Sequence, residues 1–304
     1  MIAQRLLCFN GECAFRNPLR LGTSVLCRRL LVLPSPFCVA TLKGHGSQVN
    51  SMAFHPTAPL LASGSHDNAL RLWKLSCDNS SATFVATLVF HSEAVVSVAF
   101  HPTVLLLATG SYDETVRLWK LSSNNSSATC VATIRGHTDI VNAVAFLPTA
   151  PLLASGSHDK TVKLWRLSSN NDSATCVATL KGHIYAIRCV AFHPTLQLLA
   201  TGSDDHTVRL WLLSSDNSSV SCVATLKEHS NWVTSVAFHP IAPLLATGSC
   251  DKTVRLWLLS SDNSSATCVA TLKGHSSGVY SVAFHPTAPL LASGSYDKTV
   301  KLWR

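Results

Sequence analysis

The stretch GHIYAIRCVAFHPTLQLLATGSDDHTVRLW occupies residues 182–211, and it recurs along the chain six times in recognisable form. Its closing tryptophan returns every 46 residues, as do a histidine near its start and an aspartate near its end. A fixed period in the forties indicates one supersecondary unit repeated along the chain. The six tryptophans are Trp73, Trp119, Trp165, Trp211, Trp257 and Trp303.

Each unit contains four apolar runs of strand length. In the fourth unit they are CVATL (176–180), IRCVAF (187–192), LLATGS (198–203) and TVRLW (207–211). They are rich in Val, Leu, Thr and aromatic residues, and turn residues separate them, as at 193–195 and 204–206. This composition predicts short β-strands, and no window carries an amphipathic helical pattern of useful length. The chain is therefore predicted to be all-β.

Four short strands in each 46-residue unit, with these landmarks, resemble a WD40 repeat, which forms one blade of a β-propeller. The resemblance covers residues 38–304 and implies a propeller of six four-stranded antiparallel blades. It also implies a non-enzymatic scaffold that binds a protein or peptide partner, within a multiprotein complex. The chain departs from the family in two ways: Lys, Arg or Leu follows the tryptophan, and the glycine before the histidine is replaced by Phe90 and Glu228.

Each unit also carries His, Ser or Thr, Asp and Trp at one spacing. An indole only donates hydrogen bonds, a carboxylate only accepts them, and a hydroxyl or a neutral imidazole can donate and accept. The four groups can therefore form one closed chain of hydrogen bonds. The resemblance implies that such tetrads tie strands together. Six copies argue against a hydrolase triad, because an active site needs only one. The tetrads are His45, Ser63, Asp67, Trp73; His91, Thr109, Asp113, Trp119; His137, Ser155, Asp159, Trp165; His183, Thr201, Asp205, Trp211; His229, Thr247, Asp251, Trp257; and His275, Ser293, Asp297, Trp303.

Residues 1–37 form a separate Arg-rich N-terminal segment with five arginines and the single acidic residue Glu12. Three interpretations stay open: a decayed blade, a targeting or disordered arm, and an artefact of the gene boundary. The first rests on residues 23–30, which lie two periods before residues 115–122. If residues 38–42 pair beside residues 299–303, the ring closes with six blades. A seventh blade requires residues 1–37.

The overall charge leaves an alternative function open. The net charge is +8, yet only 13% of the residues are charged and the mean hydropathy is +0.24, so adhesive faces are plausible. No apolar run is long enough to span a membrane. A basic nucleic-acid or polyanion binder is the alternative, although one basic residue per unit distributes the charge instead of clustering it. These residues are Arg71, Arg117, Lys163, Arg209, Arg255 and Lys301.

Cysteines and histidines give no sign of a metal site, a cofactor or catalysis. Five cysteines share one repeat position and are interpreted as small buried thiols in a reducing, intracellular compartment, either the cytoplasm or the nucleus. Histidines in a Phe-His-Pro turn are interpreted as solvated. The G-x-S-x-G match at 274–278 lacks a following helix. The cysteines are Cys38, Cys130, Cys176, Cys222 and Cys268, and the histidines are His55, His101, His193, His239 and His285.

The units are near copies, so the positions at which they differ are informative. Differences concentrate in the five residues after the repeat histidine and at the residue before the repeat aspartate. Because strand direction alternates, both positions leave the blade at one end, which we call the variable end. The opposite end, with its Phe-His-Pro and Ser/Asn loops, is nearly the same in all units and is called the uniform end.

Tyr, Trp and Arg gather at the variable end of units four to six. These residue types dominate interface hot spots. Consecutive units are neighbours in a ring, so the side chains are predicted to form one partner-binding patch; drift on an exposed loop is the alternative. The predicted patch comprises Tyr185, Arg188, Asp204, Trp232, Tyr280, Tyr296 and Tyr112.

Overall fold

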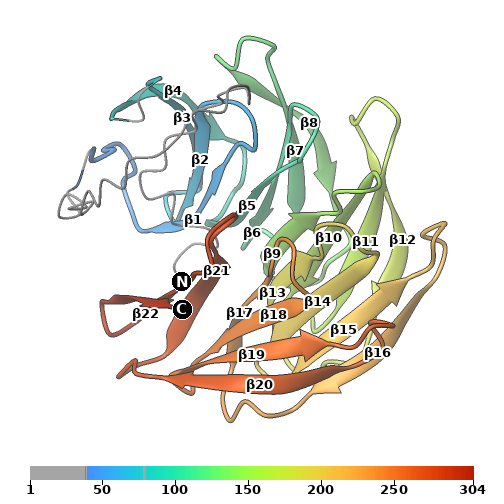
Figure 1. Cartoon of the computed structure of the whole chain (residues 1–304). Coiled ribbons are helices and arrows are strands. Elements are labelled where there is room, and N and C mark those ends of the chain that lie inside the picture. The colour runs from blue at the N-terminus through green and yellow to red at the C-terminus, as the bar shows by residue number, and fades with distance from the viewer. Residues whose placement is uncertain (1–37, 39, 78–79) are drawn as a thin grey trace, which may run out of the picture.

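The described residues form an all-β propeller with six blades. The computed structural model describes Cys38, residues 40–77 and residues 80–304. All regular secondary structure in this part of the chain is β-strand. The strands form six antiparallel sheets that follow one another around a central axis (Figure 1). The fold class predicted from the repeats is confirmed. The three interpretations of residues 1–37 lie outside the described residues.

The first three blades contain four strands each. Blade 1 comprises β1 (Val49–Phe54), β2 (Leu60–Ser65), β3 (Ala69–Leu75) and β4 (Ala82–Val89). Blade 2 comprises β5 (Val95–Phe100), β6 (Leu106–Ser111), β7 (Val116–Leu121) and β8 (Ala128–Ile134). Blade 3 comprises β9 (Val141–Phe146), β10 (Leu152–Ser157), β11 (Val162–Leu167) and β12 (Ala174–Leu180).

The last blade differs from the others by one strand. Blade 4 comprises β13 (Ile187–Phe192), β14 (Leu198–Ser203), β15 (Val208–Leu213) and β16 (Val220–Leu226). Blade 5 comprises β17 (Val233–Phe238), β18 (Leu244–Ser249), β19 (Thr253–Leu259) and β20 (Ala266–Lys273). Blade 6 comprises β21 (Val279–Phe284), β22 (Leu291–Ser295) and β23 (Val300–Trp303).

The core of the protein lies between blades, where each sheet packs on the next. Val208 and Leu210 of β15 are fully buried against Val233 and Val236 of β17, and equivalent clusters join the other consecutive blades. Gly202 permits this close approach, since a Cβ there would lie 2.7 Å from the Val233 side chain. A blade therefore buries its apolar faces only against neighbours, as expected of a repeat architecture.

The tetrad side chains form hydrogen-bonded chains inside every blade. In blade 4, the Trp211 indole donates to the Thr201 hydroxyl (2.9 Å), which lies 2.9 Å from His183 Nε2, and His183 Nδ1 lies 2.7 Å from Asp205. Because the carboxylate only accepts, Nδ1 carries the proton and Nε2 accepts from the hydroxyl. The same three contacts recur in the other five blades.

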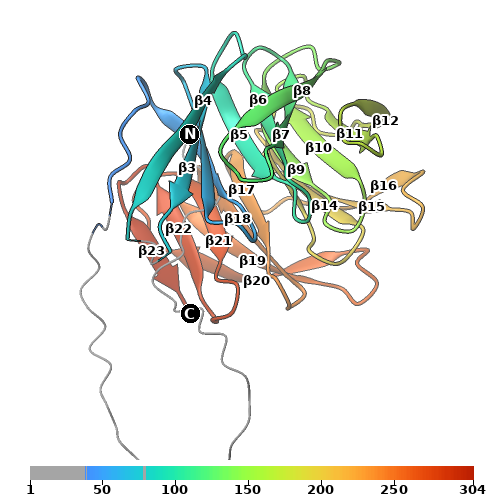
Figure 2. The same ribbon diagram turned by 90° about the horizontal axis from the view of Figure 1, so that it is seen from above.

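The predicted closing strand is not formed. The first and last blades flank the same side of the ring (Figures 1 and 2), but the described residues among 38–42 are not in a strand and blade 6 has three strands. Val300 and Leu302 are 60% and 59% exposed, whereas Val208 and Leu210 in blade 4 are 0% exposed.

Two histidines of the Phe-His-Pro turns, His101 and His193, are buried, so the prediction that they are solvated is wrong for these two; His55, His239 and His285 are half-buried. His193 is buried, its ring lies edge-on to Phe238 of the next blade at 5.1 Å, and burial lowers its pKa. Its Nδ1 accepts backbone N–H groups from Thr195 and Leu196. The turn thus fixes the imidazole of His193, and this imidazole packs one blade on the next.

The repeat-position cysteines are not buried, contrary to the sequence-based interpretation. They are exposed or half-buried free thiols, because each lies on an outer strand, or on the segment before β1, with its side chain facing outward. In β12, for example, Leu180 at the end of the strand is buried while Cys176 is exposed. Sequence hydrophobicity alone does not distinguish the inner face of this strand from its outer face.

Replacing Trp211 with Phe tests the contribution of a tetrad to stability. The variant leaves the buried Thr201 hydroxyl without the indole N–H that donates to it, so the free energy of unfolding should fall by about 1–3 kcal/mol. Urea denaturation measures it. Trp232→Phe is the matched control, since Trp232 belongs to no tetrad and should tolerate the change; equal stability of Trp211→Phe and wild type would contradict the role of the tetrad.

The tetrad carboxylates also predict a loss of stability in acid. Burial alone would raise the pKa of Asp205, but hydrogen bonds from His183 and Thr207 outweigh it and hold the pKa well below its usual value. A carboxyl with a lowered folded pKa contributes stability above its unfolded pKa of about 3.9 and loses it as the pH falls. The free energy of unfolding should therefore decline from about pH 5 downward, and less steeply in Asp205→Asn. Parallel curves for the two proteins would contradict this assignment.

Candidate binding pocket at the variable end

A β-bulge near the start of every inner strand aims one side chain toward the axis. In β13, Ile187 and Val190 are both buried in one core although they lie three residues apart, which a regular strand cannot achieve. The register shift between Ile187 and Cys189 resolves the conflict by leaving Arg188 as the extra residue. The bulge residues of the six blades are Asn50, Val96, Asn142, Arg188, Thr234 and Tyr280.

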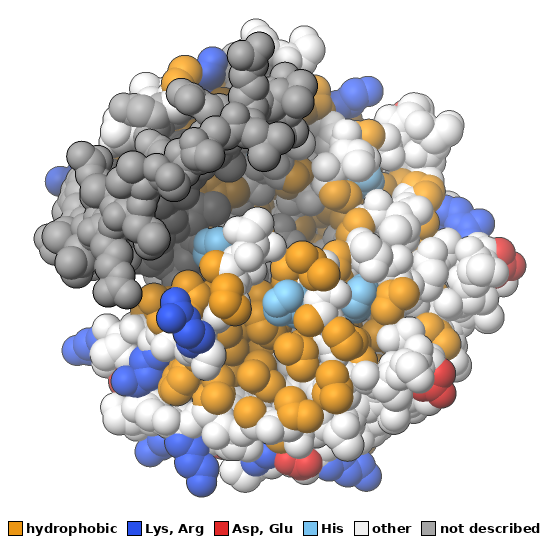
Figure 3. All heavy atoms as spheres, in the orientation of Figure 1, with side chains coloured by type: hydrophobic (Ala, Val, Ile, Leu, Met, Phe, Trp, Pro, Cys, Tyr) orange, Lys and Arg blue, Asp and Glu red, His pale blue; other side chains and the backbone are white. Residues whose placement is uncertain are grey.

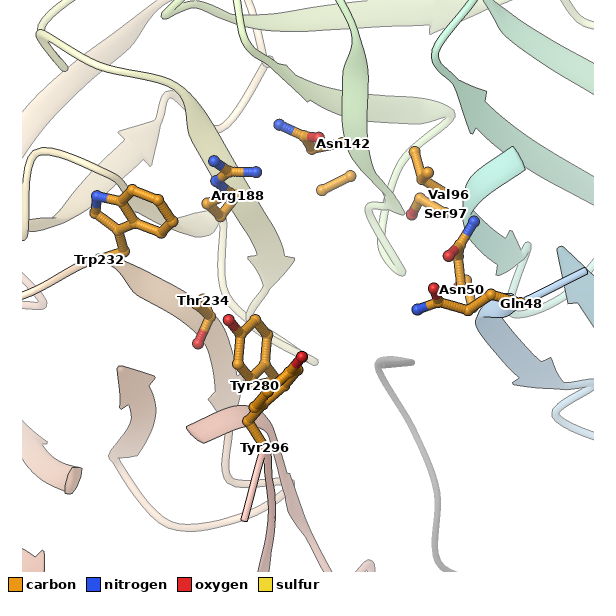
Figure 4. Close-up of a pocket in the computed structure, with 12 residues that line it drawn as sticks. Gln48, Asn50, Val96, Ser97, Asn142, Arg188, Trp232, Thr234, Tyr280 and Tyr296 are labelled. Carbon is orange, nitrogen blue, oxygen red and sulfur yellow. The ribbon is translucent and has the colours of Figure 1, made fainter. Parts of the chain in front are cut away.

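These bulge residues line one pocket at the variable end. The cavity has a volume of about 320 Å³, and all six bulge side chains contribute to its wall (Figure 4). A pocket of this size holds one large side chain or a small group. The remaining lining residues are Gln48, Ser51, Ser97, Ala143, Trp232 and Tyr296.

Arg188 is held in place by an ion pair and an aromatic ring. Its Nε and Nη2 atoms donate to the two oxygens of Asp204 at 2.7 and 2.6 Å, and its guanidinium carbon lies 5.2 Å from the Trp232 ring centroid. Burial would lower the pKa of Arg188, but the Asp204 carboxylate outweighs it and raises the pKa. Arg188 therefore stays charged beside Asp204, and their opposite charges cancel in the pocket wall.

Three aromatic rings form one side of the pocket. Trp232 and Tyr296 are 44% and 71% exposed, and Tyr280 is half-buried with its ring centroid 5.9 Å from that of Tyr296. Figure 4 shows Trp232 on one side of Thr234 and the two tyrosines on the other. Exposed aromatic rings beside a hollow provide contact area for a partner at a low cost in side-chain entropy.

The structure places the seven predicted site residues in three groups. Arg188, Trp232, Tyr280 and Tyr296 meet in the pocket, and Asp204 lies behind Arg188. Tyr185 and Tyr112 do not line the pocket. The Tyr185 ring lies 5.9 Å from Lys160 Nζ on the exposed surface, and the Tyr112 ring lies 5.4 Å from the ring of His66.

The polar lining residues were missed by the sequence analysis. Asn50, Asn142 and Thr234 occupy the same repeat position as Arg188 and Tyr280, and that shared position was the available signal. Amides and hydroxyls at this position are less typical of interface hot spots than aromatic rings and Arg, so residue type alone does not single them out. The bulge that turns this position inward was not inferred.

Polar bulge residues also fasten neighbouring inner strands to each other. The Asn50 amide donates to Val95 O at 3.1 Å, and the Asn142 amide donates to Ile187 O at 2.7 Å. The Thr234 hydroxyl lies within hydrogen-bond distance of Val279 O on the next blade. Side chains of the pocket wall thus cross from blade to blade, which makes the pocket a preformed feature of the ring.

The described part of the chain offers no side-chain cluster for metal binding. Among these residues there is no group of three or more His, Cys, Asp or Glu side chains that could hold a metal ion. In the G-x-S-x-G match, Ser276 lies between β20 and β21, so no helix follows it. The adjacent His275 contacts Ser293 and Asp297 within its tetrad.

Two surface properties bear on the kind of partner. No helix in the described residues is long and apolar enough to cross a membrane. Hydrophobic side chains gather around the middle of the face seen in Figure 3, while Lys and Arg side chains lie mainly at its edge. This distribution differs from the central basic cluster that nucleic-acid binding favours.

The family model described as "WD40: WD domain, G-beta repeat" matches the chain six times. The matched residues are 36–74, 82–120, 128–166, 174–211, 220–257 and 266–304. These matches cover most of the chain and coincide with the structural repeats. The chain therefore belongs to the WD40 family, whose propellers are generally protein-interaction scaffolds and typically not enzymes.

Removing the Arg188 side chain should destabilise the protein. Arg188→Ala leaves the nearly buried Asp204 carboxylate without its counter-charge, so we expect a loss of about 3 kcal/mol in the free energy of unfolding. The double variant Arg188→Ala/Asp204→Ala should recover part of this loss, because it removes the unpaired charge. Urea denaturation of wild type, the two single variants Arg188→Ala and Asp204→Ala, and the double variant gives a complete double-mutant cycle. Additive losses would contradict the coupling between the two residues.

Proposed function

We propose that this protein is a non-enzymatic scaffold that binds a protein or peptide partner at the variable end of the ring. A segment of the partner inserts a side chain into the pocket between Arg188, Trp232, Tyr280 and Tyr296. The surrounding loops contact the flanking residues of that segment. The protein then acts by holding its partner within a larger complex.

The observation that carries this proposal is the contrast between the two ends of the ring. The blades are near copies, and their uniform ends differ little, yet at the variable end the bulge position holds five different residue types in six blades. The side chains that differ line a hollow and include exposed aromatic rings. Drift alone gives no reason for the aromatic and Arg residues to meet at one pocket.

The chemistry of the pocket supports a partner with an apolar or aromatic side chain. Large and rigid side chains bury much area at little entropic cost, and a central Trp often carries more than about 2 kcal/mol of binding energy. The partner's backbone can exchange hydrogen bonds with Gln48 and with the tyrosine hydroxyls. We place the protein inside the cell, most favourably in the cytoplasm, because exposed free thiols persist in a reducing compartment; disulfide-linked species in the protein isolated from its source would contradict that placement.

The variant Trp232→Ala tests the proposal. It removes a half-exposed ring from the pocket wall, so partner binding should weaken about tenfold or more, which corresponds to about 1.4 kcal/mol. The melting temperature should stay close to that of wild type. Quantitative affinity capture from the native source identifies the partner, and calorimetry with the purified partner gives the affinities.

Ile241→Ala is the matched control on the opposite end. Ile241 is 85% exposed in the loop between β17 and β18, at the uniform end, so its removal should change neither stability nor binding. His239 is unsuitable as a control because it packs on Phe284, and Asn217 is unsuitable because its φ is 56°. If Ile241→Ala lost the partner while Trp232→Ala retained it, the binding face would be the uniform end.

A further inference from the structure

Four lysines surround the aromatic side of the pocket. Lys227 and Lys273 end the outer-strand segments that precede β17 and β21, and Lys252 and Lys298 lie in the turns between β18 and β19 and between β22 and β23. All four belong to the variable end of blades 4 to 6 and are exposed. None of them forms an ion pair with any residue that the structure describes. We call these four residues the lysine sector.

Nearby carboxylates are already engaged. Asp251 and Asp297 accept hydrogen bonds from His229 and His275 inside the tetrads. Glu228 pairs with Arg255 on β19. The positive charge of the lysine sector is therefore not neutralised by the adjacent acidic groups.

The opposite side of the ring carries both signs of charge, since Lys43, Arg135, Lys160 and Lys181 are also exposed there. Glu93 and Glu114 are exposed at the variable end of blade 2, and Asp139 lies partly exposed in the loop that leads into β9. The variable end is thus basic beside the aromatic rings and mixed in charge across the pocket. A partner that crosses the ring meets these two regions in a fixed order.

The backbone does not require lysine at these turns. Lys252 and Lys298 have φ values of 72° and 66°, and the equivalent turn residues of the other blades, Asn68, Glu114, Lys160 and His206, adopt the same left-handed conformation. Asn is better suited to this conformation than Lys. Since the fold accepts Asn, Glu and His there, the choice of Lys sets the surface charge and not the turn.

We infer that the partner segment is an acidic, extended peptide that lies over the lysine sector and inserts one large apolar or aromatic side chain into the pocket. This inference rests on the function proposed above. The pocket supplies the anchor site, since Arg188 is neutralised by Asp204 and the exposed rings of Trp232 and Tyr296 face an apolar group favourably. The lysines supply complementary charge, which gives specificity and a faster association rate.

A nucleic acid fits this surface less well than a short acidic peptide. A long phosphate chain that crosses the ring would pass from the lysine sector to Glu93, Glu114 and Asp139, which repel it. Nucleic-acid grooves also carry basic residues along the whole path of the backbone. Here the acidic residues interrupt the basic ones on one side of the pocket.

Selection from a random peptide library tests the inference on the full-length protein. The probe is a display library of random dodecapeptides, selected at about 0.1 M salt, where charges within about 10 Å still interact. The selected pool should be enriched in Asp and Glu beside one Phe, Tyr, Trp or Leu. A pool that is neutral or basic, or a failure to enrich any sequence, would overturn the inference.

Charge reversal locates the binding surface. The variant Lys252→Glu/Lys298→Glu should weaken binding of the selected peptide about tenfold or more, whereas Lys120→Glu, an exposed lysine near the uniform end of β7, should leave it unchanged. Raising the salt should weaken wild-type binding and have less effect on the double variant. Equal binding by all three proteins would overturn the inference.

Two further measurements separate this inference from the proposed function and from nucleic-acid binding. If Trp232→Ala abolishes selection but the selected peptides are not acidic, the pocket function stands and the acidic partner is wrong. If Trp232→Ala has no effect on binding, the proposed function itself fails. A single-stranded 20-nucleotide DNA that displaces the peptide, and that binds with the same dependence on Lys252 and Lys298, would identify a polyanion site instead.

Discussion

The hydrogen bond between His183 and Asp205, repeated in every blade, is the interaction on which the variable end depends. It joins His183, at the start of the loop before the inner strand, to Asp205, in the turn between the second and third strands. Asp205 also accepts the backbone N–H groups of Ile184 and Thr207, so one carboxylate holds both backbone segments. The Thr201 hydroxyl and the Trp211 indole complete the chain and bury it. The loop is thereby fixed without help from its own side chains.

This arrangement explains why the variable end tolerates variation. Because the backbone is held by the tetrad, the exposed loop residues and the bulge residue are free to differ from blade to blade without loss of the fold. The β-bulge then converts that freedom into a binding surface, since it turns one variable side chain of each blade toward the axis. Six positions that are distant in the sequence meet in one pocket. The uniform end has no such freedom, because its histidines pack on the phenylalanines of the next blade.

Charge adds a direction to the pocket. Arg188 and Asp204 cancel inside the wall, while Lys252 and Lys298 on one side and Glu93 and Glu114 on the other remain unpaired among the described residues. The ring itself has no polarity around its axis, because its blades are near copies. The order of these side chains breaks that symmetry, and under the proposed function it favours one orientation of the partner.

The sequence alone determined the six repeats, the strand content and the residues available for the tetrads, because each of these follows from a period and from residue chemistry within one unit. It also indicated the variable end, because strand alternation assigns both variable positions to the same end. Only the tertiary structure decided which side chains meet. A bulge at the repeat position of Arg188 breaks the two-residue alternation in each blade. Asn50, Asn142 and Thr234 therefore enter the pocket, while Tyr185 and Tyr112 stay outside it. The exposure of Cys176 and Val300 was likewise decided between sheets, since burial in this ring depends on the neighbouring blade and not on the hydrophobicity of the strand itself.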